Sequence, residues 1–218
     1  MEEFLNKRKS RLVALIILSV VVIFAGSRLY SQYREQVIRT EESQLLTMAG
    51  IVGNNLNSYM EQQLEEIDLF YSQEGMPENV WAESGGINAR TAYFLKNNAG
   101  VYNWITVTEP DGTKFRYEPG KKTFRESADG EVKAVASQDG NHPAEITGKE
   151  ISDQTGWYEL YIEKNVPVGS EVYMLTFAMD LGALYEKIVA PVKIGEAGYS
   201  SVKDQNMNII MHHVKNQI

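Results

Sequence analysis

The sequence contains no cysteine, three histidines and six prolines. Without cysteine the chain can form no disulfide, thiolate metal site or lipid-modified cysteine, and it has no cysteine nucleophile. An enzyme site usually needs several convergent titratable side chains, and so few histidines leave a thin set. No Ser-His-Asp, zinc-ligand or phosphate-binding glycine spacing is present. We therefore expect no enzymatic activity, no metal and no other cofactor in these residues.

Positive charge is scarce after the N-terminus. Six of the 21 Lys and Arg residues precede Glu35, against two of the 29 Asp and Glu residues, so the remainder carries 15 basic and 27 acidic side chains. A surface this acidic repels nucleic-acid phosphates. Nucleic acid is therefore not an expected partner.

The first segment predicts a membrane anchor. Residues 12–27 form an uncharged run of 16, LVALIILSVVVIFAGS, and its helical length of roughly 24 Å approaches the hydrocarbon core. If Arg28 extends to the headgroups, residues 12–30 can cross the membrane. The flanking KRKSR places residues 1–11 in the cytoplasm and the rest outside. A cleaved signal peptide is the alternative, with Ala25-Gly26-Ser27 as the cleavage site. We expect an anchor that is retained.

A long helix is expected to follow, over residues 31–74. No proline occurs between Tyr33 and Tyr71, and apolar or small residues recur every three or four positions. This stripe can pack on its own domain or on the same helix of a second copy. The sequence therefore predicts a stalk through which the protein forms a homodimer, with packing on its own domain as the other possibility.

Residues 75–192 have the pattern of a compact α+β domain. A short helix is expected over residues 85–98, with Ala89, Ala92, Tyr93 and Leu95 as its buried side. Five strands are expected, in one antiparallel sheet covered by helices: residues 101–108, 114–118, 145–151, 157–168 and 171–180. Turn residues at Pro110-Asp111-Gly112 and near Gly169 join two of the hairpins. The polar stretch from residue 123 to 143 is expected to be irregular with short helical patches.

The last segment, residues 193–218, has the pattern of a further β-hairpin. The stretch KIGEAGYSSVKDQNMNIIMHH reads as a loop, a strand, a turn at Gln205–Asn208 and a second strand. Two strands alone are marginally stable in water. We expect this hairpin to pack weakly, outside the main core. His212 and His213 are adjacent, so on a strand they would point to opposite faces and not form one metal site.

These features together resemble the extracytoplasmic Cache (PAS-like) sensor domains of bacterial receptors. The anchor, the stalk and the five-stranded sheet match, TFAMDLGALYEKI resembles the end of the membrane-distal module of a double Cache domain, and VKIGEAGYSSVKDQNMNIIMHH resembles the start of the membrane-proximal module. The resemblance implies a truncated second module over residues 193–218. It also implies a ligand-binding receptor ectodomain whose output would be a histidine kinase, a diguanylate cyclase or a chemotaxis domain.

The resemblance also suggests a ligand site. Family members often bind a ligand amine with an aspartate at the position of Asp180, although an aspartate before a helix is also what N-capping predicts. Amino-acid-binding members carry Arg-x-Trp-Tyr, but here no Trp-Tyr follows Arg125. Aromatic candidates are Tyr102 and Trp104, expected on one face of the first strand, with Tyr117 and Trp157 nearby; such residues are more often core.

The sequence therefore predicts the ligand-sensing ectodomain of a membrane receptor, with a small molecule as its ligand and any kinase or cyclase activity in a part that this sequence does not contain. A membrane-anchored adhesion domain or hydrolase is the alternative.

Overall fold

The computed structural model describes residues 2–72, 86–121, 124–126, 142–193 and 198–214, with the backbone alone for 2–14 and 124–126. The chain divides into two units, Met1–Ile51 and Val52–Ile218, which are described separately. The expected helical patches between residues 127 and 141 lie outside the described residues.

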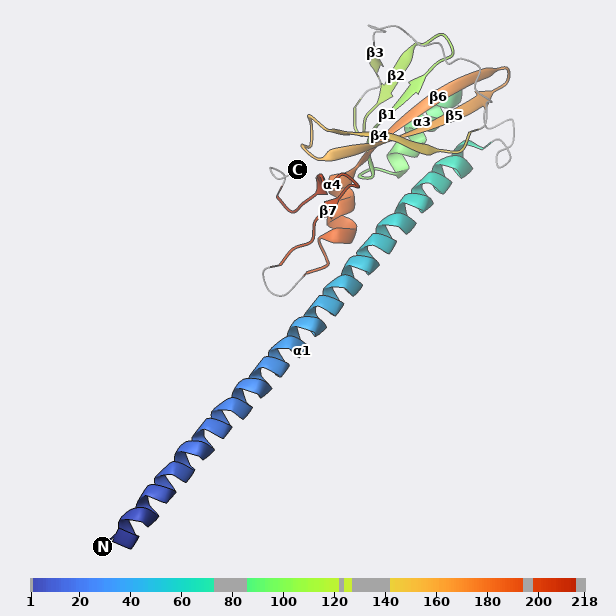
Figure 1. Cartoon of the computed structure of the whole chain (residues 1–218). Coiled ribbons are helices and arrows are strands. Elements are labelled where there is room, and N and C mark those ends of the chain that lie inside the picture. Colours follow the sequence, from blue (N-terminus) through green and yellow to red (C-terminus); the bar gives the residue numbers. More distant parts are fainter. Residues whose placement is uncertain (1, 73–85, 122–123, 127–141, 194–197, 215–218) are drawn as a thin grey trace. The chain divides into compact units, whose positions relative to one another are not determined.

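One helix, α1 (Glu2–Tyr71), contains both the expected anchor and the expected stalk (Figure 1). In its first unit the apolar side chains are exposed, for example Ile23 at 71% and Phe24 at 67%. By length and composition this helix could cross a membrane, and a signal sequence near the N-terminus would have the same length and composition. Leu45 and Leu46 of the stalk are also exposed.

The second unit is built on a six-stranded antiparallel sheet with the order β3-β2-β1-β6-β5-β4 (Figure 1). The predicted fold class is confirmed: all five expected strands are present, and a short strand adds to them at one edge. The strands are β1 (Tyr102–Thr108), β2 (Lys114–Tyr117), β3 (Phe124–Glu126), β4 (Glu145–Ile151), β5 (Tyr158–Val168) and β6 (Glu171–Asp180). Residues 124–126 were expected to be irregular and instead form a strand, because β3 pairs with β2.

The turns form as their residues predict. Gly112 has φ 85° and Gly169 has φ 65°, a region that glycine enters without steric penalty. The backbone of Glu109 donates to Thr113, and Gly112 donates back to Glu109, which closes the first turn. Each hairpin therefore has its register fixed locally.

The two faces of the sheet differ. On one, here called the helix face, Ile105, Phe177 and Ile162 are fully buried in the main core beneath the end of α1 and helix α3 (Gly86–Asn97). The opposite surface, here called the polar face, carries the side chains of alternate strand residues such as Trp104, Thr106, Arg116 and Glu159, because strand residues alternate between faces.

A β-bulge lies between Tyr102 and Trp104. Tyr102 is the partner of Met179, while Trp104 is the partner of Ala178, so one extra residue separates them in β1. A bulge of this kind moves the next side chain to the other face. The expectation that Tyr102 and Trp104 share a face is therefore wrong: Tyr102 is 1% exposed in the main core, and Trp104 lies on the polar face.

Helix α3 forms where expected but presents a different side to the core. Its buried residues are Ile87, Arg90, Thr91, Phe94 and Leu95. Of the four residues expected to be buried only Leu95 is, and Tyr93 is 60% exposed. The stripe that includes Phe94 is selected because that ring packs against Tyr71, Tyr102 and Phe177.

A buried ion pair joins the last turns of α1 to the sheet. Lys164 of β5, with a side chain 5% exposed, lies 2.8 Å from the Asp68 carboxylate and also donates to the His142 carbonyl at 2.8 Å. The same Asp68 oxygen accepts a hydrogen bond from the Ala144 amide. One carboxylate thus fixes both the helix and the chain entering β4.

A second hydrophobic cluster lies at the end of the sheet. The short helix α4 (Leu181–Leu184) follows β6 directly and continues into a π-helix, η2 (Tyr185–Val189). Buried side chains from α1, the turn before β5, α4, η2 and the tail meet there: Val52, Trp157, Leu181, Leu184, Tyr185, Val189 and Met211. The helix after Asp180 is therefore made of two short forms, α4 and η2.

The tail forms the expected hairpin of β7 (Val202–Lys203) and β8 (Ile209–Met211). It lies outside the main core as predicted, with Met211 3% exposed in the second cluster. That the hairpin packs weakly stays a prediction. In its turn, Met207 has positive φ, at 66°.

The two histidines also differ from expectation. Strand β8 ends at Met211, so His212 and His213 do not alternate across it. Both rings instead contact Tyr199, with centroids 4.8 and 3.7 Å from its ring, and His212 is 3% exposed. His212 is therefore buried beside Tyr199, whereas His213 contacts the same ring from an exposed position.

An ion pair between Lys149 of β4 and Asp204 holds the tail hairpin to the sheet. Asp204 also accepts hydrogen bonds from the amides of Asn206 and Asn208. The hydrogen bond from Lys149, and after it those from the turn, lower the pKa of Asp204 from 3.8 to about 2. Because the folded-state pKa is depressed, this contribution is complete above pH 3.8 and is lost as the pH falls through about 2.

We therefore expect Lys149→Met to accelerate hydrogen exchange at the amides of β8 at neutral pH, and to raise the pH at which the tail hairpin loosens on acidification. Lys203→Met, an exposed lysine of the same hairpin, is the control. Equal exchange rates in the wild type and Lys149→Met would show that the ion pair does not hold the tail.

Candidate functional site

Three carboxylates lie in one row across the polar face. Glu159 of β5 is the cross-strand partner of both Glu150 in β4 and Asp180 in β6. Side chains of directly opposed residues point to the same face, and like charges placed this way repel. A cation bound beside the row would remove this repulsion.

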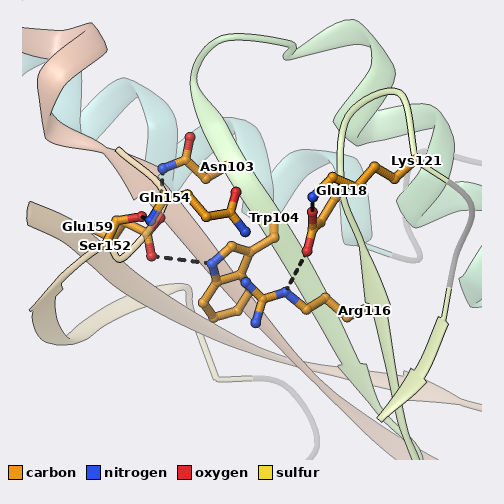
Figure 2. A network of polar contacts seen from close by, with 8 residues as sticks. All are labelled: Asn103, Trp104, Arg116, Glu118, Lys121, Ser152, Gln154 and Glu159. Carbon is orange, nitrogen blue, oxygen red and sulfur yellow. Dashed lines mark hydrogen bonds and ion pairs between the residues drawn. The ribbon is translucent and has the colours of Figure 1, made fainter. Parts of the chain in front are cut away.

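Glu159 is the central and most buried member of the row, at 4% exposure. It accepts hydrogen bonds from the side-chain amide (Nδ2) of Asn103 at 2.6 Å and from the indole Nε1 of Trp104 at 3.2 Å (Figure 2). Both donors are neutral, and among the described residues no cationic group lies within ion-pair distance of Glu159. A buried carboxylate without a cation partner is costly, so the position favours a cationic group supplied from outside.

Two aromatic rings lie in the next row. The Trp104 and Tyr161 centroids are 5.6 Å apart, and Ala178, which lies between them in the sheet register, is small enough to let them meet. The Tyr161 hydroxyl donates to Glu150 at 3.0 Å. Burial first, and then the hydrogen bond to Glu150 and the charges of Glu150 and Glu159, raise the pKa of Tyr161 to about 12. Tyr161 is therefore a neutral hydroxyl at physiological pH.

Three charged side chains, Arg116, Glu118 and Lys121, lie in contact with one another beside the Trp104 ring. The Arg116 guanidinium lies 4.2 Å from the centroid of the Trp104 ring, and its Nε is 3.3 Å from Glu118, which also pairs with Lys121 (Figure 2). Cation–π contact and the ion pair both fix the guanidinium. On the polar face, the Trp104 indole therefore contacts both the Arg116 guanidinium and the buried Glu159 carboxylate.

The turn between β4 and β5 closes the site near Glu159. Figure 2 shows Ser152 and Gln154 beside Glu159, with Gln154 extending towards Trp104. The Ser152 hydroxyl accepts from the backbone amides of Gln154 and Thr155, and its own amide donates to the Trp157 carbonyl. The turn is therefore fixed by its own hydrogen bonds.

Of the six residues predicted for the site, Trp104 and Asp180 lie on the polar face near Glu159. The Asp180 carboxylate accepts a hydrogen bond from the Gly182 amide at 2.8 Å, so it caps α4 as the alternative interpretation predicted. Its position as the cross-strand partner of Glu159 also places it in the acidic row. Whether it binds a ligand stays a prediction.

The other four residues lie elsewhere. Tyr102 is in the main core, where its hydroxyl donates to Gln63. Tyr117 donates to Asn88 and lines a cavity of about 280 Å³ between α3 and the end of β2, on the helix face. Trp157 is in the second cluster, stacked on Tyr185. Arg125 is in β3, where only the backbone is described.

Sequence reasoning missed Glu159, Asn103, Arg116 and Tyr161. The alternation of Glu159, Tyr161 and Glu163 in β5 does indicate a polar face. Nothing in that pattern indicates that Asn103 and Trp104, from a distant strand, would supply the hydrogen bonds to Glu159. Among the described residues no group of three His, Asp or Glu side chains is arranged to hold a metal ion.

No protein-family model and no curated protein matches the sequence. Solved structures do match. The ligand-binding domain of the Campylobacter jejuni chemoreceptor Tlp3, in complex with 4-methylisoleucine, superposes with a TM-score of 0.50 at 11% identity, over 78% of this chain and 70% of that one. This similarity shows that the two share a fold.

Two other sensory proteins are similar at lower scores. The extracellular domain of the histidine kinase vpHK1S-Z8 has a TM-score of 0.48 and 16% identity over 67% of this chain. A domain of a sensory box/GGDEF family protein from Vibrio parahaemolyticus has a TM-score of 0.47 and 18% identity over 69%. The chain covers 60% and 64% of those two structures.

Proposed function

We propose that the chain is the ligand-sensing part of a membrane receptor and that its ligand is a small molecule carrying a cationic group. The observation that carries this proposal is the buried Glu159 carboxylate, whose described hydrogen-bond donors are neutral. A ligand ammonium or guanidinium group would supply the missing positive charge, and the rings of Trp104 and Tyr161 would contact it from one side.

The comparison with Tlp3 supports the sensing role through the shared fold alone. In this proposal α1 anchors the protein, residues 75–192 are the sensing module outside the cytoplasm, and residues 193–218 begin a second module of the Cache type. The output would be a kinase, a cyclase or a chemotaxis domain. No described cluster of residues has the arrangement of a hydrolytic site, so we propose no second function.

The stalk is the proposed dimer contact. Between Val52 and Tyr71 the apolar stripe of α1 is covered by its own domain, through residues such as Ile67. Before Val52 the stripe continues through Ile38 and Leu45, which are 42% and 41% exposed. A second copy of the same helix would cover these side chains. Cross-linking through a cysteine introduced at Leu45, in a chain that has no other cysteine, would test this contact.

Calorimetry on the full chain in detergent tests the ligand class. The probes are putrescine and choline, which are cations without a carboxylate, and L-valine and 4-methylisoleucine, which have both groups. We expect at least one probe to bind, and Glu159→Gln to weaken that binding by about 30-fold or more, because an unpaired buried charge contributes about 2 kcal/mol or more. Asp180→Asn, which retains the cap, should weaken it less.

Glu145→Gln, at an exposed position of the edge strand β4, is the matched control and should leave the affinity unchanged. Equal affinity in the wild type and Glu159→Gln would exclude Glu159 as the cation site. Binding of none of the four probes would contradict the proposed ligand class.

A further inference from the structure

The segment α4–η2, residues 181–189, connects the polar face to helix α1. It begins directly after Asp180, whose carboxylate caps it and whose backbone lies opposite Glu159. It ends in a π-turn, in which the Ala190 amide donates to the Tyr185 carbonyl at 2.9 Å. A π-turn contains one residue more than an α-turn; such turns are rare, and they frequently occur at functional sites.

Trp157 holds the start of this segment. A Cβ added at Gly182 would lie 2.5 Å from Cδ1 of Trp157, which is closer than any side chain could approach. The indole ring also stacks on Tyr185, with centroids 5.5 Å apart and planes at 25°. Because Trp157 is two residues before Glu159, a shift at the beginning of β5 must displace the ring, α4 or both.

The other end of the segment contacts α1. The Lys187 ammonium lies 4.5 Å from the centroid of the Tyr59 ring. Leu184 and Val189 are buried in the cluster that contains Val52 and, at its edge, Leu56. Met211 of β8 belongs to the same cluster, so the segment also contacts the tail hairpin.

We propose that α4–η2 is a coupling element that transmits the charge state of the Glu159 row to α1 through Trp157, η2 and Lys187. The proposal rests on the proposed function, since ligand binding at Glu159 is the event transmitted. Neutralising Glu159 removes its repulsion with Glu150 and Asp180. The chain at Trp157 and the end of β6 at Asp180 then move closer to each other. The π-turn supplies the second state. Lys187 lies inside this turn, so conversion to α-helical hydrogen bonding rewinds residues 185–189 and moves Lys187 around the helix axis, away from Tyr59.

Glu159→Gln imitates neutralisation of the row without any ligand. We measure hydrogen exchange by mass spectrometry on the full chain in detergent, at peptides covering residues 52–60 of α1. The expected result is a change of about threefold or more in exchange rate at these amides, because their exchange depends on a local opening equilibrium and that equilibrium shifts. In Lys187→Met the same change should be strongly reduced, because the contact with Tyr59 is absent.

Lys193→Met is the matched control, since Lys193 is exposed and follows the same segment, and it should leave the response to Glu159→Gln intact. The proposal is overturned if Glu159→Gln alters exchange near Asn103 but not at residues 52–60, or if Lys187→Met leaves the response unchanged. Failure of the proposed function is seen separately, in the calorimetry. If the chain binds none of the probes but its exchange at residues 52–60 responds to Glu159→Gln, the coupling proposal stands and the proposed ligand class is wrong.

Discussion

Asp68→Ala is expected to lower the free energy of unfolding by about 3 kcal/mol, because it leaves the Lys164 ammonium buried without its carboxylate. The usual range for breaking a buried ion pair is about 3 to 5 kcal/mol. The lower end applies here because the Asp68 side chain is 32% exposed. The substitution also removes the acceptor for the Ala144 amide. Urea unfolding followed by tryptophan fluorescence is the measurement, since all three tryptophans follow residue 80.

A second substitution separates the loss of charge from the loss of packing. Lys164→Met keeps an apolar side chain of similar length in the core, and Asp68 can still be hydrated, so we expect a cost of about 1 kcal/mol. The double variant should be more stable than Asp68→Ala alone, because it contains no unpaired ammonium. If the double variant is the least stable of the three, the ion pair is not the cause of the Asp68→Ala effect.

Gly182→Ala is expected to destabilise the second unit by about 1 to 3 kcal/mol, although alanine is the better helix former. The added methyl group would meet the Trp157 ring at 2.5 Å, and that ring is fixed between Gly182 and Tyr185. The same urea titration measures the loss. A blue or red shift of the native tryptophan emission should accompany it, because the environment of Trp157 changes.

The matched control is Gly53→Ala in the exposed side of α1, where nothing lies within 4 Å of the added methyl group. This variant should be more stable than the wild type by up to about 1 kcal/mol. Equal stabilisation by the two substitutions would show that Trp157 does not restrict Gly182.

The fold was largely predictable because its signals are local. Alternating strand residues and the turn residues Pro110, Asp111 and Gly112 specify the first hairpin within one short stretch, and the structure has it at the same residues. Strand β3 has three residues in a polar stretch, too few to show alternation, and it forms because β2 offers a free edge.

The candidate site was less predictable because it depends on register. The β-bulge that separates Tyr102 from Trp104 arises in the pairing of β1 with β6, whose sequences lie far apart. The row of Glu150, Glu159 and Asp180 likewise exists only once β4, β5 and β6 are aligned. Asp180 was found through the family resemblance, whereas Glu159 has the appearance of any solvent-facing glutamate until its partners are known.

The strand order has a consequence for how the domain folds. Strands β1, β2 and β3 are neighbours in both sequence and space, and so are β4, β5 and β6, so each half can form from short-range contacts. In the described sheet, the backbone hydrogen bonds that join the halves are those between β1 and β6, as at Ile105 and Phe177. Bringing β1 and β6 together costs chain entropy before their hydrogen bonds and side-chain contacts can form. Contacts between distant parts of the sequence are therefore slow to form. The β1–β6 seam is therefore expected to form last and to limit the folding rate, and during synthesis the first half must wait for β6 before its sheet is complete.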